Sequence, residues 1–223
     1  MKHLELFSGT HSFGKISSKF GYDVISLDRD MGPDCPFGTG YTSKNHIEED
    51  IMTWNYKQFP KGHFHIVTAS PVCLWWSTLR HCRKGSFDKK LGRKLTAEDI
   101  ENDIIELGIP MVEKVLEIID YFEPKYYIIE NPQTGKLKEQ EFMQGLHYVD
   151  ADYCMYGMPY RKRTRIWTNK IVLPKLCNRR CGSWLNGKHI ANIGNGLKEY
   201  NSLRIKSKDS YVIPEKLILE LIL

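Results

Sequence analysis

The sequence predicts an α/β protein with a doubly wound, mostly parallel sheet and a small basic extension at its C-terminal end. Short apolar runs of strand length alternate along the chain with segments of helical periodicity. A glycine-containing turn follows the first apolar run. Polar or reactive side chains directly follow several of the other apolar runs. This alternation favours a parallel sheet because a parallel connection needs a crossover, which is usually a helix.

The predicted strands fall into two groups. Four runs are short and mostly apolar, as strands buried on both faces are, and comprise residues 3–7, 23–28, 64–69 and 126–130. Two later runs, residues 147–153 and 165–169, are expected to close the sheet as a hairpin. No internal repeat or low-complexity tract interrupts this order.

Three segments have helical patterns: residues 12–20, 96–122 and 211–223. The second is the clearest, because Thr96 followed by Asp99 matches a capping box and apolar residues then recur on one face. Pro110 is expected to kink this helix. The third helix is expected to begin near Pro214 and to have one apolar face.

The turn after the first run matches a phosphate-binding loop except at its last position. Gly9, Gly14 and Lys15 have the required spacing, but Ile16 stands where the motif needs a hydroxyl for Mg²⁺. A hydrocarbon side chain cannot bind a hard cation, so a nucleotide kinase is disfavoured. What the pattern predicts is a strand, a glycine turn and a helix N-terminus, where α/β proteins bind a ligand against free backbone N–H groups.

Length and composition are typical of one domain with a full core. The 223 residues contain no apolar stretch long enough to cross a bilayer, and the N-terminus lacks a signal-peptide pattern. We therefore expect a cytoplasmic protein that does not bind membranes, and we expect it to be a monomer. The six cysteines are too scattered for a disulfide framework, so thiols or metal ligands are expected.

The positive charge is concentrated in the last third of the chain. The whole sequence carries +5, but residues 151–223 hold 14 Lys and Arg against 5 Asp and Glu, a net charge of +9. Residues 1–150 are correspondingly acidic. This asymmetry favours a surface that binds a polyanion, attached to a neutral or acidic body, although a solvated basic tail is the alternative.

Polar and reactive residues follow the predicted strands at their carboxyl ends. In an open α/β sheet these ends share one edge, and ligands bind there. The residues are Phe7, Ser8 and Gly9; Asp28; Asp50 and Ile51; Pro71 and Cys73; and Glu130, Asn131 and Pro132. Asp28 stands about 20 residues beyond the glycine turn, where a carboxylate that binds a ribose is expected. The edge therefore combines a nucleoside-binding half with a cysteine and a glutamate.

Four motifs, in order along the chain, resemble those of the DNA (cytosine-5) methyltransferases. FSGTHSFG at residues 7–14 is similar to the family's first S-adenosylmethionine motif, and SPVCLWWS at residues 70–77 to its nucleophile loop. Residues 130–132 are the ENP triplet of the family, and RKRTR at residues 161–165 resembles a later Q-x-R-x-R motif.

The chain departs from the family pattern at three places. Val72 replaces the proline usual before the cysteine, and Arg161 stands in place of the glutamine. Only 55 residues follow Thr168, where the family usually has a sizeable target-recognition region. The chain therefore resembles the compact versions found in viruses and phages, which implies a host-cell nucleus or cytoplasm as the alternative location.

The resemblance implies a class I, Rossmann-like methyltransferase that takes S-adenosylmethionine as cofactor and double-stranded DNA as partner. It implies cofactor contacts at Phe7, Ser8, Gly9, Gly14, Asp28, Asp50, Ile51 and Pro71. It also implies a catalytic domain at residues 1–170, a reduced recognition segment at 171–210, and a helix at 211–223 that packs back on the catalytic domain.

In the family's reaction a cysteine thiolate adds to C6 of an extruded cytosine, which makes C5 nucleophilic. Cys73 is the implied nucleophile, and Glu130 is the implied acid or hydrogen-bond donor at N3. Arg163 or Arg165 would supply the cation that favours the thiolate, and phosphate binding is the alternative for both arginines. The implied substrate contacts are Ser77, Asn131, Pro132 and Arg161.

Two features around the nucleophile leave alternatives open. Trp75 and Trp76 suit stacking on the extruded base or packing beneath the loop. The basic segment 78–94 suits a lid over the target base or an ordinary solvated loop.

Cys177, Cys181 and His189 are weak candidates for a zinc site. Their spacing is not that of a standard finger, and the fourth ligand is left open between Cys154 and His147. Unligated thiols, and hence no metal, are the expected state.

Two other functions compete with DNA methylation. A short recognition region and a basic tail suit RNA, such as tRNA, equally well. Val72 and the reduced recognition region are also compatible with a catalytically silent homologue that binds nucleic acid.

Overall fold

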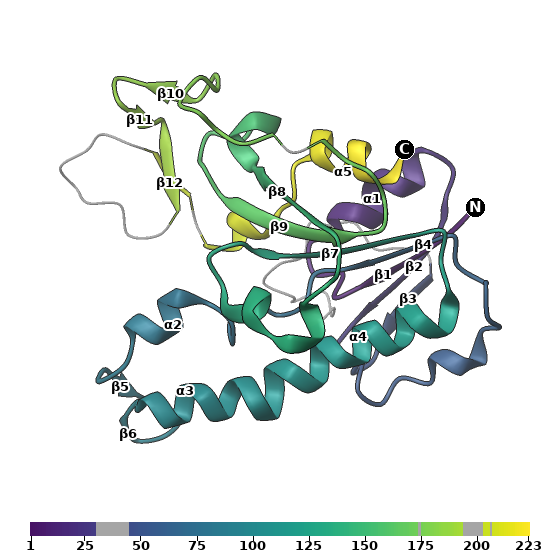
Figure 1. Cartoon of the computed structure of the whole chain (residues 1–223), viewed down its shortest axis with the longest axis horizontal. Coiled ribbons are helices and arrows are strands. Elements are labelled where there is room, and N and C mark those ends of the chain that lie inside the picture. Colours follow the sequence, from purple (N-terminus) through teal and green to yellow (C-terminus); the bar gives the residue numbers. More distant parts are fainter. Residues whose placement is uncertain (30–44, 174, 194–202, 206) are drawn as a thin grey trace.

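The computed structural model describes residues 1–29, 45–173, 175–193, 203–205 and 207–223, and its centre is a seven-stranded sheet (Figure 1). The strand order is β3-β2-β1-β4-β7-β9-β8. Their bounds are β1 Lys2–Leu6, β2 Asp23–Asp28, β3 Asn45–Glu48, β4 Ile66–Ala69, β7 Tyr126–Pro132, β8 Tyr148–Asp152 and β9 Arg163–Thr168. Only β9 runs antiparallel to its neighbours, so the predicted mostly parallel sheet is confirmed.

All six predicted strands are present, and the structure adds β3. The sequence did not reveal this strand because its four residues, NHIE, contain one aliphatic side chain and are intermediate or exposed. It lies at the sheet edge beside β2. β8 and β9 pair as the predicted hairpin, with β9 on the inside against β7.

Helices cover both faces of the sheet (Figure 1). Helices α1 (Ser12–Lys19) and α5 (Glu215–Ile222) contact each other and pack over one hydrophobic cluster, which contains Ile66, Ile128 and Ile166. Helix α4 (Ile109–Phe122) packs over a second cluster on the other face. The last helix follows Pro214, as the sequence predicts, and its apolar face is buried.

The predicted long helix forms in three parts. Helix α3 (Ala97–Asp103) begins with the expected capping box of Thr96 and Asp99. A π-helical turn, Ile104–Gly108, then leads into α4. Pro110 lies in the first turn of α4, where its missing N–H costs least. The interruption is therefore a π turn just before the proline, and Gly108 in that turn lies so close to Trp76 that a β-carbon would sit 2.9 Å from the indole ring.

The remaining elements are small. They are α2 (Thr78–Cys82) and the two-residue strands β5 (Phe87–Asp88) and β6 (Arg93–Lys94), then β10 (Trp184–Leu185), β11 (Lys188–His189), β12 (Ala191–Ile193) and β13 (Leu203–Ile205). None of the helices in the described ranges combines the length and apolarity that crossing a bilayer requires.

A buried histidine connects β1, β4 and α1. His3 is fully buried, its Nδ1 lies 2.8 Å from Ser17 Oγ, and its Nε2 lies 2.9 Å from Thr68 Oγ1. Burial lowers the pKa of His3 to about 4, although Glu5 acts in the opposite direction. The imidazole is therefore neutral in the folded protein at neutral pH.

We expect His3 to make the fold acid-sensitive. Between pH 6.5 and 4, His3 is protonated in the unfolded chain but stays neutral in the folded chain. The contribution of neutral His3 to the free energy of unfolding is therefore complete above pH 6.5 and is lost as the pH falls. At pH 5 the loss is about 2 kcal/mol in the free energy of unfolding. Urea unfolding of the wild type and of His3→Gln at pH 7 and pH 5 measures it. The wild type should lose more stability than the variant; an equal loss in both would contradict the assignment.

Candidate active site

The loop after β4 carries Cys73 at the carboxyl edge of the sheet. Pro71 is buried, Val72 is exposed and Cys73 is partly exposed. Asn131 donates a hydrogen bond from Nδ2 to the carbonyl oxygen of Pro71 at 2.9 Å. Asn131 is itself buried near the end of β7, so the ENP triplet holds the backbone of the cysteine loop.

Glu130 precedes that asparagine on β7, and its side chain is buried among three hydrogen-bonding or charged groups. Tyr153 donates from its hydroxyl to Oε1 at 3.0 Å, and the Thr164 hydroxyl donates to the same oxygen. Lys162 Nζ lies 3.5 Å from Oε1. All three contacts fall on Oε1, and no side chain or backbone group within the described residues donates to Oε2. The carboxylate is thus fixed by one oxygen, and the other oxygen is available to a ligand.

The pKa of the Cys73 thiol is affected by burial and by two charged side chains, Lys162 and Glu130. Burial raises the pKa of the Cys73 thiol, and the nearby Glu130 carboxylate raises it as well. The Lys162 ammonium lowers it. Burial, followed by the charge of Glu130, raises the pKa of Tyr153, so its phenol stays protonated and donates.

The cation beside Cys73 is Lys162, not the predicted Arg163 or Arg165. Arg163 makes a two-pronged ion pair with Asp152, at 3.0 and 2.7 Å, and Arg165 makes one with Asp150, at 2.8 and 3.0 Å. Alternate residues of a strand point to opposite faces, so both arginines lie on the face of β9 opposite Thr164 and Glu130. The role of the arginines in catalysis stays a prediction, but the proposed charge effect on the thiol belongs to the lysine.

We expect Lys162→Met to raise the pKa of the Cys73 thiol further. Removal of a nearby positive charge destabilises the thiolate, so alkylation of Cys73 should need a higher pH. The rate of iodoacetamide labelling, followed by mass spectrometry on the Cys73 peptide over a range of pH, measures this shift. Lys125→Met is the matched control, because Lys125 lies before the opposite end of β7. An unchanged labelling profile for Lys162→Met would contradict the assignment.

The first loop forms a tight backbone turn between β1 and α1. Phe7 and Gly9 have positive φ angles of 54° and 38°. The backbone N–H of Gly9 donates to Asp28 Oδ2 at 2.8 Å, and that of Ser8 donates to the Leu27 carbonyl at 3.1 Å. The carboxylate at the end of β2 therefore lies against the glycine turn, as the sequence predicts for a ribose contact.

Glu5 is a functional candidate that sequence reasoning missed. This buried carboxylate accepts hydrogen bonds from the backbone N–H groups of Phe13 and Gly14, at 3.0 and 2.9 Å, and from Ser26. A β-carbon on Gly14 would lie 2.4 Å from Glu5 Oε2. Gly14 is therefore needed where α1 approaches Glu5, and its predicted cofactor contact stays untested. A charged residue inside an apolar strand was the available signal.

The second predicted cofactor pair lies after β3. Asp50 accepts a hydrogen bond from the Met52 backbone N–H at 2.9 Å, and its carboxylate lies 3.6 Å from Arg29 Nη1. Ile51 is buried in the cluster beneath α4. Asp50 is partly exposed, so it is the member of the pair that is accessible to a ligand.

Trp76 packs beneath the cysteine loop. Its side chain is fully buried against Gly108, and its carbonyl accepts a hydrogen bond from the backbone N–H of Lys136 at 2.9 Å. Of the two functions considered for this tryptophan, the structure supports packing. Trp75 is partly buried, and the Arg80 guanidinium lies 5.5 Å from the centre of its indole ring.

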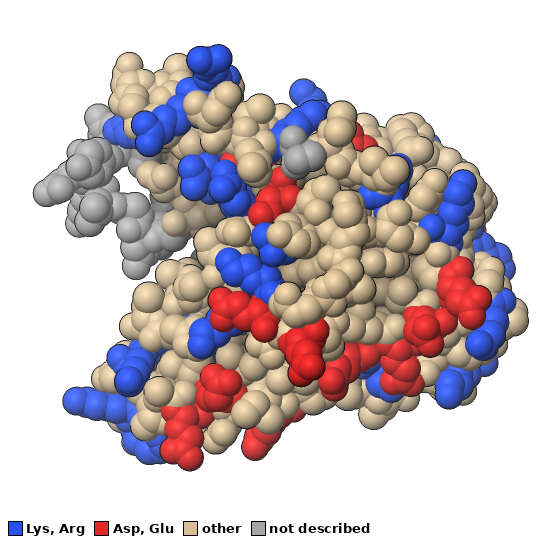
Figure 2. All heavy atoms as spheres, viewed as in Figure 1, with Lys and Arg blue, Asp and Glu red and all other residues tan. Residues whose placement is uncertain are grey.

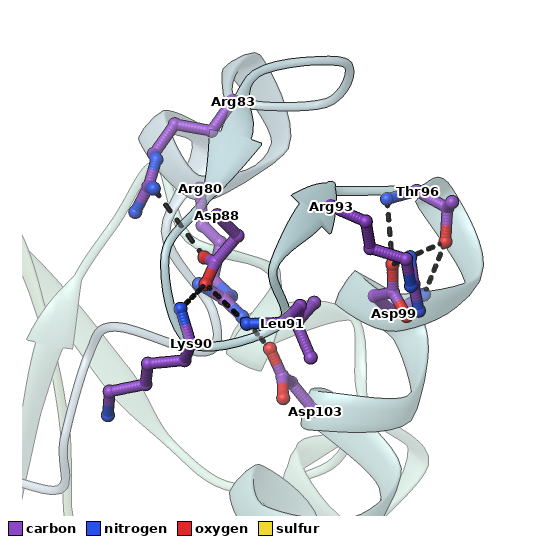
Figure 3. A network of polar contacts seen from close by, with 9 residues as sticks. All are labelled: Arg80, Arg83, Asp88, Lys90, Leu91, Arg93, Thr96, Asp99 and Asp103. Carbon is purple, nitrogen blue, oxygen red and sulfur yellow. Dashed lines mark hydrogen bonds and ion pairs between the residues drawn. The ribbon is translucent and has the colours of Figure 1, made fainter.

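The basic segment after the nucleophile is folded as α2 and the β5–β6 hairpin. Ser77 caps α2 by accepting a hydrogen bond from the Leu79 backbone N–H. Figure 3 shows how side chains fasten this part to α3: Arg80 pairs with Asp103, and Arg93 pairs with Asp99 at 2.6 and 2.7 Å. The segment is therefore an ordered arm, and its predicted function as a lid stays untested.

Basic residues gather on two parts of the surface. Figure 2 shows blue spheres near β5–β6 and near β10–β11, with a notch in the molecular outline between them, and red spheres along α4. Arg161, in the predicted substrate set, is half exposed, and its Nε lies 3.9 Å from Asp152 Oδ1. The basic residues near β10–β11 belong to residues 151–223, whose positive charge predicts a polyanion surface, and that surface stays a prediction.

The three weak metal candidates lie together in a second cluster. Cys177, Cys181 and His189 meet Cys154, and one ligand atom from each of the four lies within 4.8 Å of the others. His147, the alternative fourth ligand, is absent from this cluster, and its Nδ1 lies 2.9 Å from the Thr168 carbonyl oxygen.

Comparison with known proteins identifies the family. No protein-family model matches the chain. A Frog virus 3 (isolate Goorha) protein named "Probable DNA (cytosine-5)-methyltransferase" is 35% identical over 182 residues, which is 79% of this chain and 75% of the relative.

The fold is similar to that of a solved methyltransferase structure. The Entamoeba histolytica methyltransferase EhMeth aligns with 78% of this chain at 13% identity and a TM-score of 0.51. The Schizosaccharomyces pombe Dnmt2 methyltransferase aligns with 75% of the chain at 16% identity and a TM-score of 0.46. The chain spans about half the length of these structures, 56% and 48%. By its similarity to the viral relative, the chain belongs to the DNA (cytosine-5) methyltransferase family.

Proposed function

We propose that this protein transfers a methyl group from S-adenosylmethionine to C5 of cytosine in DNA, through a covalent bond between Cys73 and C6. Family membership supports the reaction type. The observation that carries the proposal is the arrangement of Cys73, which lies after β4, and Glu130, which lies near the end of the neighbouring strand β7, with the Glu130 carboxylate raising the pKa of the Cys73 thiol and Glu130 Oε2 unoccupied by the described residues.

Each group has a defined task in the proposed reaction. The Cys73 thiolate adds to C6 while Glu130, which must carry a proton on Oε2 at this step, gives that proton to N3. The C5–C6 electron pair shifts into the C4–C5 bond, the C4–N3 pair takes up the proton at N3, and C5 becomes nucleophilic. C5 then forms a bond to the methyl carbon as the bond from that carbon to the donor's sulfonium sulfur breaks, and the sulfur keeps the electron pair. A base removes the C5 proton, the double bond re-forms, and the sulfur leaves as thiolate. Lys162 stabilises the thiolate at the first and last steps.

S-adenosylmethionine would supply the methyl group as an electrophile. The edge at β1, β2 and β3 fits it chemically, because the turn at Phe7, Ser8 and Gly9 lies against the Asp28 carboxylate, and carboxylates suit ribose hydroxyls. Asp50 is an accessible second carboxylate at this edge. These residues would hold the nucleoside part of the cofactor.

Double-stranded DNA is the proposed partner. The net charge of +9 on residues 151–223 suits a phosphate backbone, and basic residues gather near β5–β6 and near β10–β11 in Figure 2. Extrusion of the target base costs a few kcal/mol, which backbone contacts offset. In this proposal residues 1–170 form the catalytic domain, 171–210 the recognition segment and 211–223 the returning helix.

Product identification tests the proposal. The protein is incubated with methyl-labelled S-adenosylmethionine and either duplex DNA or tRNA, and the nucleic acid is digested to nucleosides. Label in 5-methyl-2′-deoxycytidine supports the proposal. If only the tRNA carries label, the assigned substrate changes from DNA to RNA. Binding of S-adenosylhomocysteine and DNA without any transfer of label would identify a catalytically silent homologue.

A further inference from the structure

The cluster of Cys154, Cys177, Cys181 and His189 lies outside the proposed catalytic site and has the geometry of a metal centre. Cys177 Sγ lies 3.6 Å from Cys181 Sγ and 3.5 Å from His189 Nε2, and Cys181 Sγ lies 3.4 Å from His189 Nε2. Cys154 Sγ completes the group within 4.8 Å.

These separations match a tetrahedron around one zinc ion. With Zn–S bonds of about 2.3 Å and a Zn–N bond of about 2.0 Å, two sulfurs lie about 3.8 Å apart and sulfur lies about 3.5 Å from nitrogen. A disulfide requires sulfurs at about 2.05 Å, far closer than the Cys177 and Cys181 sulfurs. Three cysteines with one histidine are also a usual ligand set for structural zinc.

The four ligands come from two distant parts of the chain. Cys154 is buried in the 3₁₀ helix Tyr153–Tyr156, which directly follows β8 of the central sheet. The other three come from the segment that ends with the β10–β11 hairpin. That hairpin has a two-residue turn, Asn186 and Gly187, with φ angles of 51° and 81°, which places His189 back beside Trp184.

Groups around the cluster support thiolate ligands. The backbone N–H of Arg179 donates to Cys177 Sγ at 3.4 Å, and such donation favours the charged sulfur of a metal ligand. The backbone N–H of Cys177 donates to Asp152 Oδ2 at 2.7 Å, and Asp152 also pairs with Arg163 of β9. The cluster is thus connected to the strand that carries Thr164 beside Glu130.

We propose that Cys154, Cys177, Cys181 and His189 bind one structural zinc ion that fastens residues 177–189 to the end of β8. So short a segment cannot form its own hydrophobic core, and metal binding supplies the stability that such a core would otherwise give. The fastened segment carries Arg179 and Arg180, which are exposed, and Lys188, which is partly exposed. That these residues then contact DNA rests on the proposed function, whereas the metal site itself does not.

Metal content of the whole purified protein tests the site directly. We expect about one zinc per chain by elemental mass spectrometry, and tetrahedral cobalt spectra with thiolate charge-transfer bands after exchange. Cys154→Ser and Cys181→Ser should each weaken cobalt binding by more than about 100-fold. The matched controls are Cys82→Ser, which changes an exposed cysteine outside the cluster, and His147→Asn; both should bind cobalt as the wild type does.

Two results would overturn the site: a folded wild-type protein that holds no zinc and takes up no cobalt, or a Cys154→Ser variant that binds cobalt as tightly as the wild type. The first result includes a Cys177–Cys181 disulfide, which thiol counting detects. With the metal removed, DNA binding should weaken by at least about tenfold while S-adenosylhomocysteine binding persists. Stoichiometric zinc without an effect on DNA would retain the metal site and contradict only the DNA contact.

Discussion

Cys73→Ser is expected to reduce methyl transfer by at least about 1,000-fold, because a serine hydroxyl is far less acidic than a thiol and gives no useful nucleophile at neutral pH. The site makes this replacement especially costly. Burial and the Glu130 carboxylate already oppose a negative charge at position 73, and Lys162 compensates only for a group acidic enough to ionise.

A covalent trap distinguishes loss of the nucleophile from loss of folding. In 5-fluorocytosine, a fluorine atom replaces the C5 hydrogen, so the catalytic base has no C5 proton to remove. The bond between sulfur and C6 therefore persists after methyl transfer. We expect the wild type and Cys82→Ser to form the adduct on denaturing gels, and Cys73→Ser to form none. Cys82 is an exposed cysteine in α2, nine residues further along the chain, and serves as the matched control. An equal yield of adduct from Cys73→Ser would exclude Cys73 as the nucleophile.

Glu130→Gln is expected to lower the rate of methyl transfer by about 10²- to 10⁴-fold, the usual contribution of a positioned proton donor. The amide has nearly the same shape and still accepts the hydrogen bonds of Tyr153 and Thr164 through Oε1. It cannot, however, release a proton to N3 when the thiolate adds to C6. The main loss should therefore appear in kcat.

Two measurements separate chemistry from binding for this variant. Titration with S-adenosylhomocysteine should give the wild-type affinity, because Glu130 lies outside the turn of Phe7 to Gly9 and the Asp28 carboxylate. Adduct formation on 5-fluorocytosine DNA should slow along with turnover. Glu139→Gln, which changes an exposed acid after β7, should behave as the wild type. Turnover of Glu130→Gln at the wild-type rate would remove Glu130 from the mechanism.

The motifs could be predicted from the sequence because each consists of residues that are adjacent along the chain. A strand, a glycine turn and a helix are local patterns, and the ends of parallel strands meet at one edge whatever the details of packing. The same rule placed Cys73 and Glu130 together before any coordinates were known. Strand β3 escaped prediction because an edge strand needs little apolar surface.

Strand alternation contained one signal that the sequence analysis did not use. Lys162 and Thr164 are two residues apart, so they project to the same side, and both reach Glu130. Arg163 and Arg165 project to the other side, toward Asp152 and Asp150. Period two therefore separates the lysine of the RKRTR motif from its arginines, and the packing of β9 against β7 then sets which side faces Glu130.

The sequence by itself determined the sheet, the family and the order of the motifs, since each follows from local periodicity or from neighbouring residues. Only the tertiary structure decided which cation faces Cys73, which oxygen of Glu130 is held, and that Cys154 rather than His147 joins the cysteine cluster. These choices depend on side-chain direction and on contacts between segments more than 20 residues apart. Such contacts are fixed by packing, which no local pattern encodes.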